Sequence, residues 1–348
     1  MLYTDDSLLI GKNDDIINSA IQELKDQELQ LTEEGTLEDF LGVNIQKLND
    51  TTYHLHQQHQ IAGILKDLRL DSTSNSKEVP MKTSTILAQD INGDPHDNSF
   101  DYRSVIGKLS HVERCTRLDL AYAVHQCARF ASSPRQSHAQ AVRWIGRYLL
   151  NSADKGYVIN IDDTQGLQLF VDSDWVGLWN RKEAPKDVNT AKSRYGFIIT
   201  FYGVPILWAS RLQTLIALSS TEAEYIGLSE AVREVIPLIH VLDELRYAGF
   251  HLPVMQTQVK CKVFEDNSGA IELATKTKVR PHTKHINVKY HHFRQLVLDG
   301  IITVQYIPSE DNPADILTKP VPKAHLTKHL QSLLKWHVVQ DLRRGVTM

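Results

Sequence analysis

Four acidic residues in the second half of this 348-residue chain, Asp172, Glu224, Asp266 and Asp315, constrain most strongly what the chain can fold into. Each of them lies at a predicted junction between a strand and a helix. Their carboxylates would gather at one end of a sheet, where they would make a poor apolar core. Clustered carboxylate oxygens are ligands that divalent cations such as Mg²⁺ prefer. Two such cations can activate water and stabilise the leaving oxygen of a phosphodiester.

The sequence around each acid supports this placement. Asp172 ends the apolar run Leu-Gln-Leu-Phe-Val, and Asp266 follows the strand-like run Val-Lys-Cys-Lys-Val-Phe-Glu. Glu224 lies at the start of a long predicted helix, and Asp315 follows the strand-like segment 301–307. The acids follow one another along the chain in the order Asp–Glu–Asp–Asp. An integrase or transposase would need the order Asp–Asp–Glu.

A second glutamate lies close to Glu224 and has a different assignment. Ser219 and Glu222 have the spacing of a capping box, in which the serine and the glutamate cap the start of a helix reciprocally. We therefore assign Glu222 to the helix start. Glu224 points to another side of the helix, so the spacing favours Glu224 as the metal ligand.

The other acids also have structural explanations. Asp315 follows an Asn-Pro pair that is typical of a helix start, where an acid complements the helix dipole. Asp266 could belong to a strand-end turn, and Asp174 could replace Asp172 as a ligand. Only the joint order and context of the acids favour a catalytic site.

The composition fits a folded protein of two or three domains. Apolar residues make up 42% of the chain, and no run of about 18 apolar residues predicts a membrane span. The N-terminus lacks the basic flank and apolar stretch of a secretory signal. The three cysteines, Cys115, Cys127 and Cys261, are far apart, which disfavours a disulfide framework or a zinc site. We expect an intracellular location, in a cytoplasmic particle or in the nucleus.

A basic stretch between residues 273 and 298 contains no acidic residue, although the net charge of the chain is −4. Such a stretch could contact a phosphate backbone, but a solvated basic helix face would have the same composition. The candidate nucleic-acid-binding residues are Lys276, Lys278, Arg280, Lys284, His285, Lys289 and Arg294. The histidines of residues 282–292 could form a zinc site, but no cysteine or carboxylate nearby completes a tetrahedral set.

The hydrophobic pattern divides the chain into regions of different character. Within the first 80 residues it predicts a strand pair at 40–45 and 53–56 and a helix at 60–68. Residues 71–100 have the composition of an irregular linker. Residues 101–151 predict three helices without a group of titratable side chains, which indicates a structural role.

From residue 166 the pattern becomes that of an α/β domain. Strands are predicted at 167–172, 195–202, 204–210, 258–264 and 301–307. Helices are predicted at 221–246, from 267 onward, at 285–299, at 312–318 and at 322–335. Pro237 should kink the first of these helices or end its first part, because proline lacks the N–H that a helix interior needs.

A further acidic pair lies near the N-terminus, in Tyr3-Thr4-Asp5-Asp6, and is followed by an apolar run. Paired acids at a hairpin turn between apolar strands could hold the catalytic metals of a polymerase. An ordinary turn would have the same sequence.

Taken together, these motifs resemble the C-terminal part of the Pol polyprotein of copia-type retrotransposons. Residues 3–6 resemble the reverse-transcriptase palm motif, with later landmarks of that domain at 40–43 and 79–81. Residues 102–109 and 117–148 resemble the connecting segment. The motifs that resemble the ribonuclease H domain lie at 170–175, 218–225, 265–267, 284–286 and 314–320.

The resemblance implies a fold and a division into domains. The expected fold is α/β, with an RNase H-like mixed five-stranded sheet and flanking helices, preceded by a partial reverse-transcriptase palm and thumb and a helical connecting segment. The expected segments are a reverse-transcriptase remnant with linker (1–95), the connecting segment (96–160), the RNase H-like domain (161–320) and a C-terminal helix and tail (321–348).

The resemblance also implies an activity and its site. Asp172, Glu224, Asp266 and Asp315 match the ligands of two Mg²⁺ ions, or of Mn²⁺, in a ribonuclease H that cleaves the RNA strand of RNA–DNA hybrids. Asp5 and Asp6 match reverse-transcriptase aspartates. The rest of the palm lies upstream of this motif in the family, so we expect no polymerase activity from this polypeptide.

The implied partners are the RNA–DNA hybrid and the remainder of the Pol polyprotein, without a membrane. The alternative is a catalytically inactive, truncated remnant of a retroelement, at most a nucleic-acid-binding module.

Overall fold

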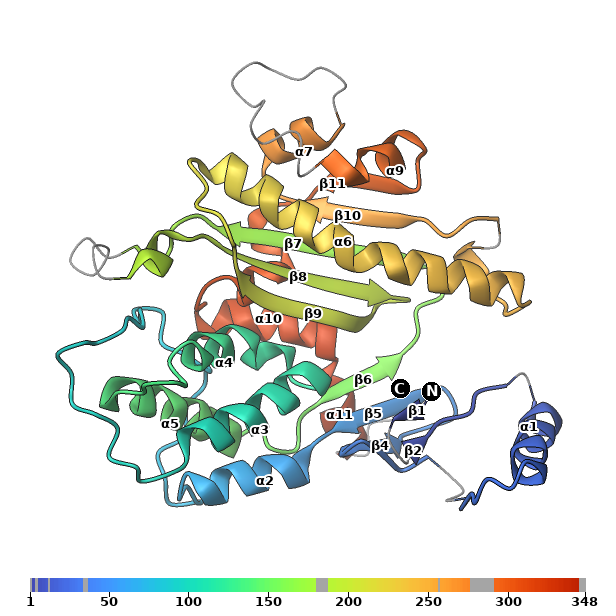
Figure 1. Ribbon diagram of the computed structural model, residues 1–348, viewed down its shortest axis with the longest axis horizontal. Coiled ribbons are helices and arrows are strands. Elements are labelled where there is room, and N and C mark those ends of the chain that lie inside the picture. Colours follow the sequence, from blue (N-terminus) through green and yellow to red (C-terminus); the bar gives the residue numbers. More distant parts are fainter. Residues whose placement is uncertain are drawn as a thin grey trace.

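A five-stranded mixed sheet forms the centre of the C-terminal half (Figure 1). The computed structural model describes residues 2–3, 6–11, 13–33, 37–179, 187–255, 257–275 and 291–343. The strands of this sheet are β7 (Leu167–Asp174), β8 (Arg194–Phe201), β9 (Val204–Leu212), β10 (Cys261–Glu265) and β11 (Ile302–Tyr306). Their order is β11-β10-β7-β8-β9. All five predicted strands are present, and the expected mixed α/β sheet is confirmed.

Strand β7 is the middle strand and joins the two kinds of pairing. It pairs with β8 in the antiparallel sense and with β10 in the parallel sense, and β10 pairs with β11 in parallel. Strands β8 and β9 form a hairpin whose turn residues, Tyr202 and Gly203, have φ of 51° and 73°. Two residues with positive φ form a turn that matches the natural twist of a hairpin.

The long helix α6 (Ser220–Tyr247) covers one face of this sheet. On β7, Leu167, Leu169 and Val171 alternate with the residues that face the opposite side, and they join the buried side chains of α6 in one apolar core. On the opposite face, Phe170 packs against a second core. Strand β7 therefore contributes side chains to the apolar cores on both faces of the sheet.

Pro237 does not end α6, which runs as one helix over 28 residues. Of the two predicted alternatives, a kink or an end at this proline, the end is wrong. Pro237 is exposed, and so is Arg233, one turn earlier. On an exposed side of a helix, water can satisfy a backbone carbonyl that loses its helical partner.

The second sheet belongs to the N-terminal half and is antiparallel. Its strands are β3 (Asp39–Phe40), β4 (Val43–Lys47), β5 (Thr52–His56) and β6 (Tyr157–Asn160), in that order. The predicted strand pair is confirmed as β4 and β5. Strand β6 comes from far along the chain and pairs with β5. The short strands β1 (Leu2–Tyr3) and β2 (Asp6–Ser7) form a separate antiparallel pair.

Helices pack around the two sheets (Figure 1). In the N-terminal half they are α1 (Asp14–Asp26), α2 (Gln58–Asp67), α3 (Tyr102–Cys115), α4 (Ala121–Ala128) and α5 (Gln136–Leu150). In the C-terminal half they are α6, α7 (Ser268–Thr275), α9 (Arg294–Leu298), α10 (Lys323–Leu334) and α11 (Trp336–Arg343), with the 3-10 helix η7 (Pro313–Leu317). The three helices predicted at 101–151 are confirmed as α3, α4 and α5, which share an apolar core.

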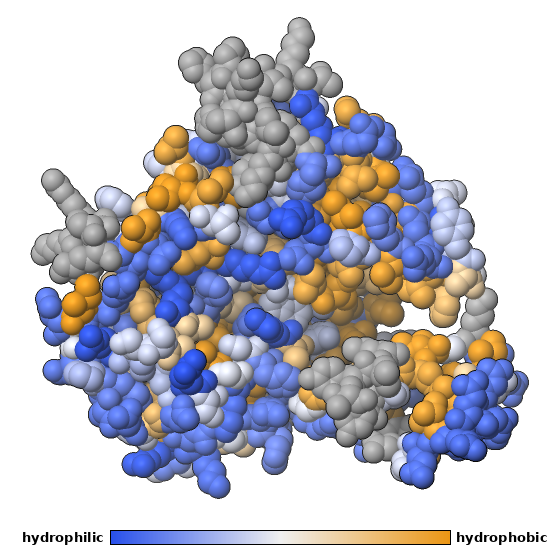
Figure 2. Space-filling model, viewed as in Figure 1, coloured by the Kyte–Doolittle hydropathy of each residue, from blue (hydrophilic) through white to orange (hydrophobic). Residues whose placement is uncertain are grey.

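The outer side of this helical segment is largely hydrophilic, whereas hydrophobic patches occur higher on the same face (Figure 2). In the part of the chain that the structure describes, no helix combines the length and the apolar character needed to cross a membrane.

The helical segment also docks on the five-stranded sheet. Leu118 and Ala121 lie in the same apolar cluster as Ile198 of β8 and Leu330 of α10. The Trp208 Nε1 of β9 donates to the backbone oxygen of Glu113 at 3.0 Å. Elements from both halves of the chain therefore share one core.

A buried ion pair stabilises this junction. Arg117 donates from Nε and Nη2 to the carboxylate of Asp119 at 2.9 and 2.8 Å, and neither side chain is exposed. Arg117 also donates to the Ser152 carbonyl at 2.7 Å, and the Tyr148 hydroxyl donates to Asp119 at 2.7 Å. The Trp336 ring of α11 lies 5.4 Å from the guanidinium. One guanidinium thus connects three separate segments.

We predict that Arg117→Met lowers the free energy of unfolding by about 3–5 kcal/mol, because it leaves Asp119 charged and buried without its partner. Urea unfolding of the full chain measures this loss. The matched control is Lys108→Met, which removes the half-exposed Lys108–Asp67 pair and should cost at most about 1 kcal/mol. Equal, small losses in both variants would contradict the prediction.

Candidate metal centre

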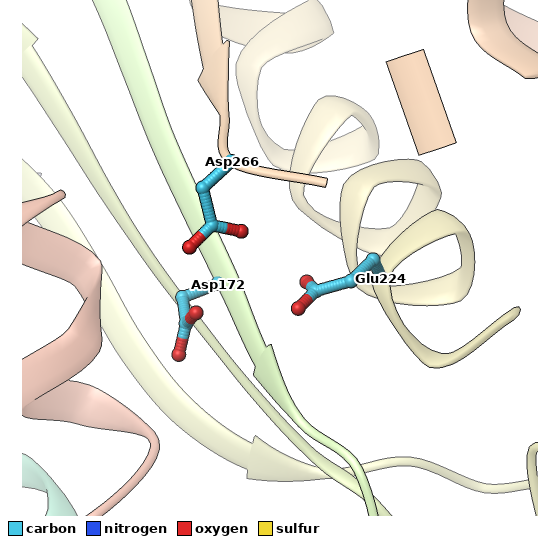
Figure 3. Close-up of side chains that lie close together, drawn as sticks. All are labelled: Asp172, Glu224 and Asp266. Atoms are coloured by element: carbon cyan, nitrogen blue, oxygen red, sulfur yellow. The ribbon is translucent and has the colours of Figure 1, made fainter. Parts of the chain in front are cut away.

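Three of the four predicted acids meet at one edge of the five-stranded sheet (Figure 3). Asp172 lies on β7, Glu224 on α6, and Asp266 directly after β10. Each offers one carboxylate oxygen, and these oxygens all lie within 4.8 Å of one another. Because β7 and β10 run parallel, their carboxyl ends reach the same edge. The start of α6 lies beside that edge and adds the third acid.

The start of α6 is fixed by the predicted cap. The backbone N–H of Glu222 donates to Ser219 Oγ at 3.1 Å, and the Leu218 N–H donates to the Glu222 carboxylate at 2.8 Å. Glu222 is thereby engaged at the helix start. Glu224 lies two residues further along the helix, on the side of Asp172 and Asp266.

The turn after β10 holds Asp266. The Asn267 N–H donates to Glu265 Oε1 at 3.1 Å, and Asn267 Oδ1 accepts from the Ala270 N–H at 3.0 Å, at the start of α7. A Cβ on Gly269 would lie only 2.8 Å from the side chain of Thr221 on α6. Glycine at position 269 therefore permits the close approach of α7 to α6. This approach brings Asp266, which precedes α7, near Glu224 on α6.

Asp315 lies beside the three acids but outside their cluster. Its helix η7 is joined to the end of β7, because Asn312 Nδ2 donates to the Val171 carbonyl at 2.7 Å. The carboxylate of Asp315 pairs with the Lys319 ammonium, and its second oxygen lies 3.2 Å from His325 Nε2. The predicted α-helix at 312–318 is a 3-10 helix, with Asn312 as its N-cap and Pro313 next to it.

Crowding and burial shift the protonation of these acids. Burial is the main cause that raises the pKa of Asp172 to about 7, and the charges of Asp315 and Asp266 act in the same direction. The Lys319 charge and a hydrogen bond from the Thr318 hydroxyl act in the opposite direction. Burial also raises the pKa of Glu224 well above its usual value, with the nearby carboxylates adding to the effect. A bound cation would relieve this repulsion.

The donor set fits a hard divalent cation. All three ligand atoms are carboxylate oxygens, the type that Mg²⁺ and Mn²⁺ prefer. Glu224 Oε2 is buried and has no hydrogen-bond partner among the described residues. Within the same residues, no lysine, arginine or histidine forms an ion pair with Asp172, Glu224 or Asp266. Asp174, the alternative to Asp172, lies outside the cluster.

Sequence reasoning missed three residues at this site, Thr318, Lys319 and His325. Thr318 hydrogen-bonds Asp172, while the other two contact Asp315. The spacing of Asp315 and Lys319, four residues apart, was a usable signal, since residues at this spacing meet on one side of a helix. No local signal placed His325, which lies on α10.

Most candidate residues for nucleic-acid binding fall outside the described residues. These are Lys276, Lys278, Arg280, Lys284, His285 and Lys289. Arg294 is described and begins α9. Asp5 also falls outside the described residues, whereas Asp6 lies in β2 of the N-terminal hairpin. The group of Asp172, Glu224 and Asp266 is the one metal-ligating group found in the described parts of the chain.

Comparisons with known proteins identify relatives of nearly the whole chain. No model of a known protein family matches the chain. The chain is 32% identical over 331 residues to the retrovirus-related Pol polyprotein from transposon TNT 1-94 of Nicotiana tabacum. The aligned region covers 93% of this chain and 23% of that protein. It is 28% identical to the Pol polyprotein from transposon RE1 of Arabidopsis thaliana, again over 93% of this chain and over 20% of the relative.

The chain therefore spans less than a quarter of the length of these relatives. Among solved structures, a foamy viral protease-reverse transcriptase in complex with RNA/DNA hybrid covers 91% of this chain at 13% identity, with a TM-score of 0.43.

We predict that Glu224→Gln, measured with a chelator present, raises the free energy of unfolding by roughly 1–2 kcal/mol, because it removes one of the crowded carboxylates. Thermal and urea unfolding measure the change. The control Glu230→Gln affects a partly exposed pair with Arg233 on the same helix and should change stability by at most about 0.5 kcal/mol. A clear loss of stability in Glu224→Gln would mean that this carboxylate is structural.

Proposed function

We propose that this chain, a relative of the Pol polyproteins of copia-type retrotransposons, contains a ribonuclease H that cleaves the RNA strand of RNA–DNA hybrids. The observation that carries the proposal is the cluster of Asp172, Glu224 and Asp266 at the edge of a mixed five-stranded sheet. Asp315 beside it completes the predicted order of four acids.

The four acids would have different roles as metal ligands. Asp172 and Asp266 are the central ligands, Glu224 helps to position one ion, and Asp315 the other. Two Mg²⁺ ions, or Mn²⁺, would activate water and stabilise the leaving oxygen of the phosphodiester when bound. The described neighbours orient the ligands, since Thr318 donates to Asp172 and the turn at Asn267 holds Asp266.

Burial of the acids contributes to the reaction in a second way. Low exposure of Asp172, Glu224 and Asp315 (3%, 7% and 7%) limits the water around them. The attraction of these carboxylates for a bound cation, and of that cation for a reacting phosphate, would be stronger in such surroundings than in bulk water.

We further propose that the hybrid is recognised by its shape and backbone, with the 2′-hydroxyl marking the RNA strand. The basic stretch 276–294 would contact phosphates. The remainder of the Pol polyprotein is the proposed protein partner, in a cytoplasmic particle or in the nucleus.

The test is Mg²⁺-dependent cleavage of a labelled RNA–DNA hybrid by the purified full chain. We predict that Asp266→Asn lowers the cleavage rate by roughly a hundredfold or more, because loss of a metal ligand removes several kcal/mol of transition-state stabilisation. The control Asp299→Asn changes an exposed aspartate at the end of α9 and should leave the rate unchanged.

Circular dichroism and thermal unfolding establish that the variants are folded, and a DNA duplex and an RNA duplex test the choice of substrate. Full activity of Asp266→Asn would refute the site. Absence of cleavage by a folded wild-type chain would favour the inactive remnant instead.

A further inference from the structure

The cations near the acidic site are distributed unevenly. On the side of Asp315, Lys319 pairs with one carboxylate oxygen and His325 Nε2 lies 3.2 Å from the other. On the side of Asp172, Glu224 and Asp266, the described residues supply no ion pair. The acids that form the tight cluster thus make no ion pair with a described cation, whereas the acid beside them does.

Lys319 is well placed to act as an internal cation. It follows η7 by two residues, four positions after Asp315, and its charge also acts on Asp172 and Asp174. Its side chain is 45% exposed, whereas that of Asp315 is 9% exposed. The ammonium therefore reaches into the acidic site from the solvent side, on a flexible four-carbon stem.

We infer that Lys319 holds the second cation position of this site in the free protein. The cluster of Asp172, Glu224 and Asp266 then binds one divalent ion. A second ion enters beside Asp315 only when the Lys319 ammonium is displaced. This inference rests on the proposed metal-dependent function and adds an order in which the site is filled.

The competition follows from geometry and charge. Mg²⁺ binds carboxylate oxygens at about 2.0–2.1 Å and demands a nearly ideal octahedral shell. An ammonium group on the same carboxylate occupies part of that shell and repels the incoming ion. One oxygen of Asp315 is engaged by the Lys319 ammonium, and the other lies 3.2 Å from His325 Nε2, which forms no hydrogen bond with the described residues.

Displacement of Lys319 needs no rearrangement of the fold. Asn312 anchors η7 to β7 through the Val171 carbonyl, and the half-exposed lysine stem moves independently of that anchor. A phosphate group of the substrate offers the ammonium an alternative partner. Binding of the substrate would then favour entry of the second ion.

The experiment counts Mn²⁺ ions bound by the full chain without nucleic acid, by electron paramagnetic resonance and isothermal titration. We predict one ion per chain for the wild type. Lys319→Gln should bind a second ion at least about tenfold more tightly than the wild type does, because a competing charge is removed. Lys319→Arg keeps the charge and should bind one ion.

Two further variants complete the design. Lys323→Gln is the matched control, because Lys323 lies four residues further on and pairs with Glu78 at the surface; it should bind as the wild type does. Asp315→Asn should still bind one ion, because the first ion occupies the three-acid cluster.

The outcomes separate this inference from the proposed function. One ion in both wild type and Lys319→Gln, or two ions already in the wild type, would overturn the inference alone. Loss of the single ion in Asp315→Asn would overturn it as well, since Asp315 would then serve the first position. No Mn²⁺ bound by folded wild-type chain would refute the metal centre, and with it both the proposed function and the inference.

Discussion

The apolar core between α6 and the five-stranded sheet is the interaction on which the rest of this structure depends, because it holds a crowded group of carboxylates together. Asp172, Glu224 and Asp266 offer oxygens within 4.8 Å of one another, although burial and mutual repulsion disfavour such a group of charges. The apolar core between α6 and the sheet supplies the opposing free energy, because it fixes the strand ends and the helix start without help from the acids. The acids therefore stay together in a geometry suited to a cation.

The part of the chain that precedes the five-stranded sheet packs against this sheet. Strand β6 returns to the N-terminal sheet, while the helical segment packs against the sheet through Leu118 and Ala121. The buried Arg117–Asp119 pair connects this segment with Ser152 and with Trp336 near the C-terminus. Removal of one partner of a buried ion pair costs the protein more stability than the intact pair contributes, because the other charge is left buried and unpaired. The pair therefore disfavours any arrangement of these segments that separates Arg117 from Asp119.

Local features of the fold were predictable because they depend on neighbouring residues. Apolar runs broken by turn residues located all five strands, and the Ser219–Glu222 spacing located the start of α6. The sequence left open whether α6 ends at Pro237, because the outcome depends on the exposure of one side of the helix. The 3-10 form of η7 was not predicted either. This short helix is attached to β7 by a hydrogen bond between residues far apart in the chain.

By itself the sequence determined which acids stand at strand ends and helix starts, because local pattern and capping depend on residues a few positions apart. Only the tertiary structure decided that three of them meet while Asp315 pairs with Lys319 and lies beside His325. The distances among the acids depend on the register of β10 on β7 and on the close approach of α7 to α6. These contacts join residues far apart in the chain, and no local propensity encodes them.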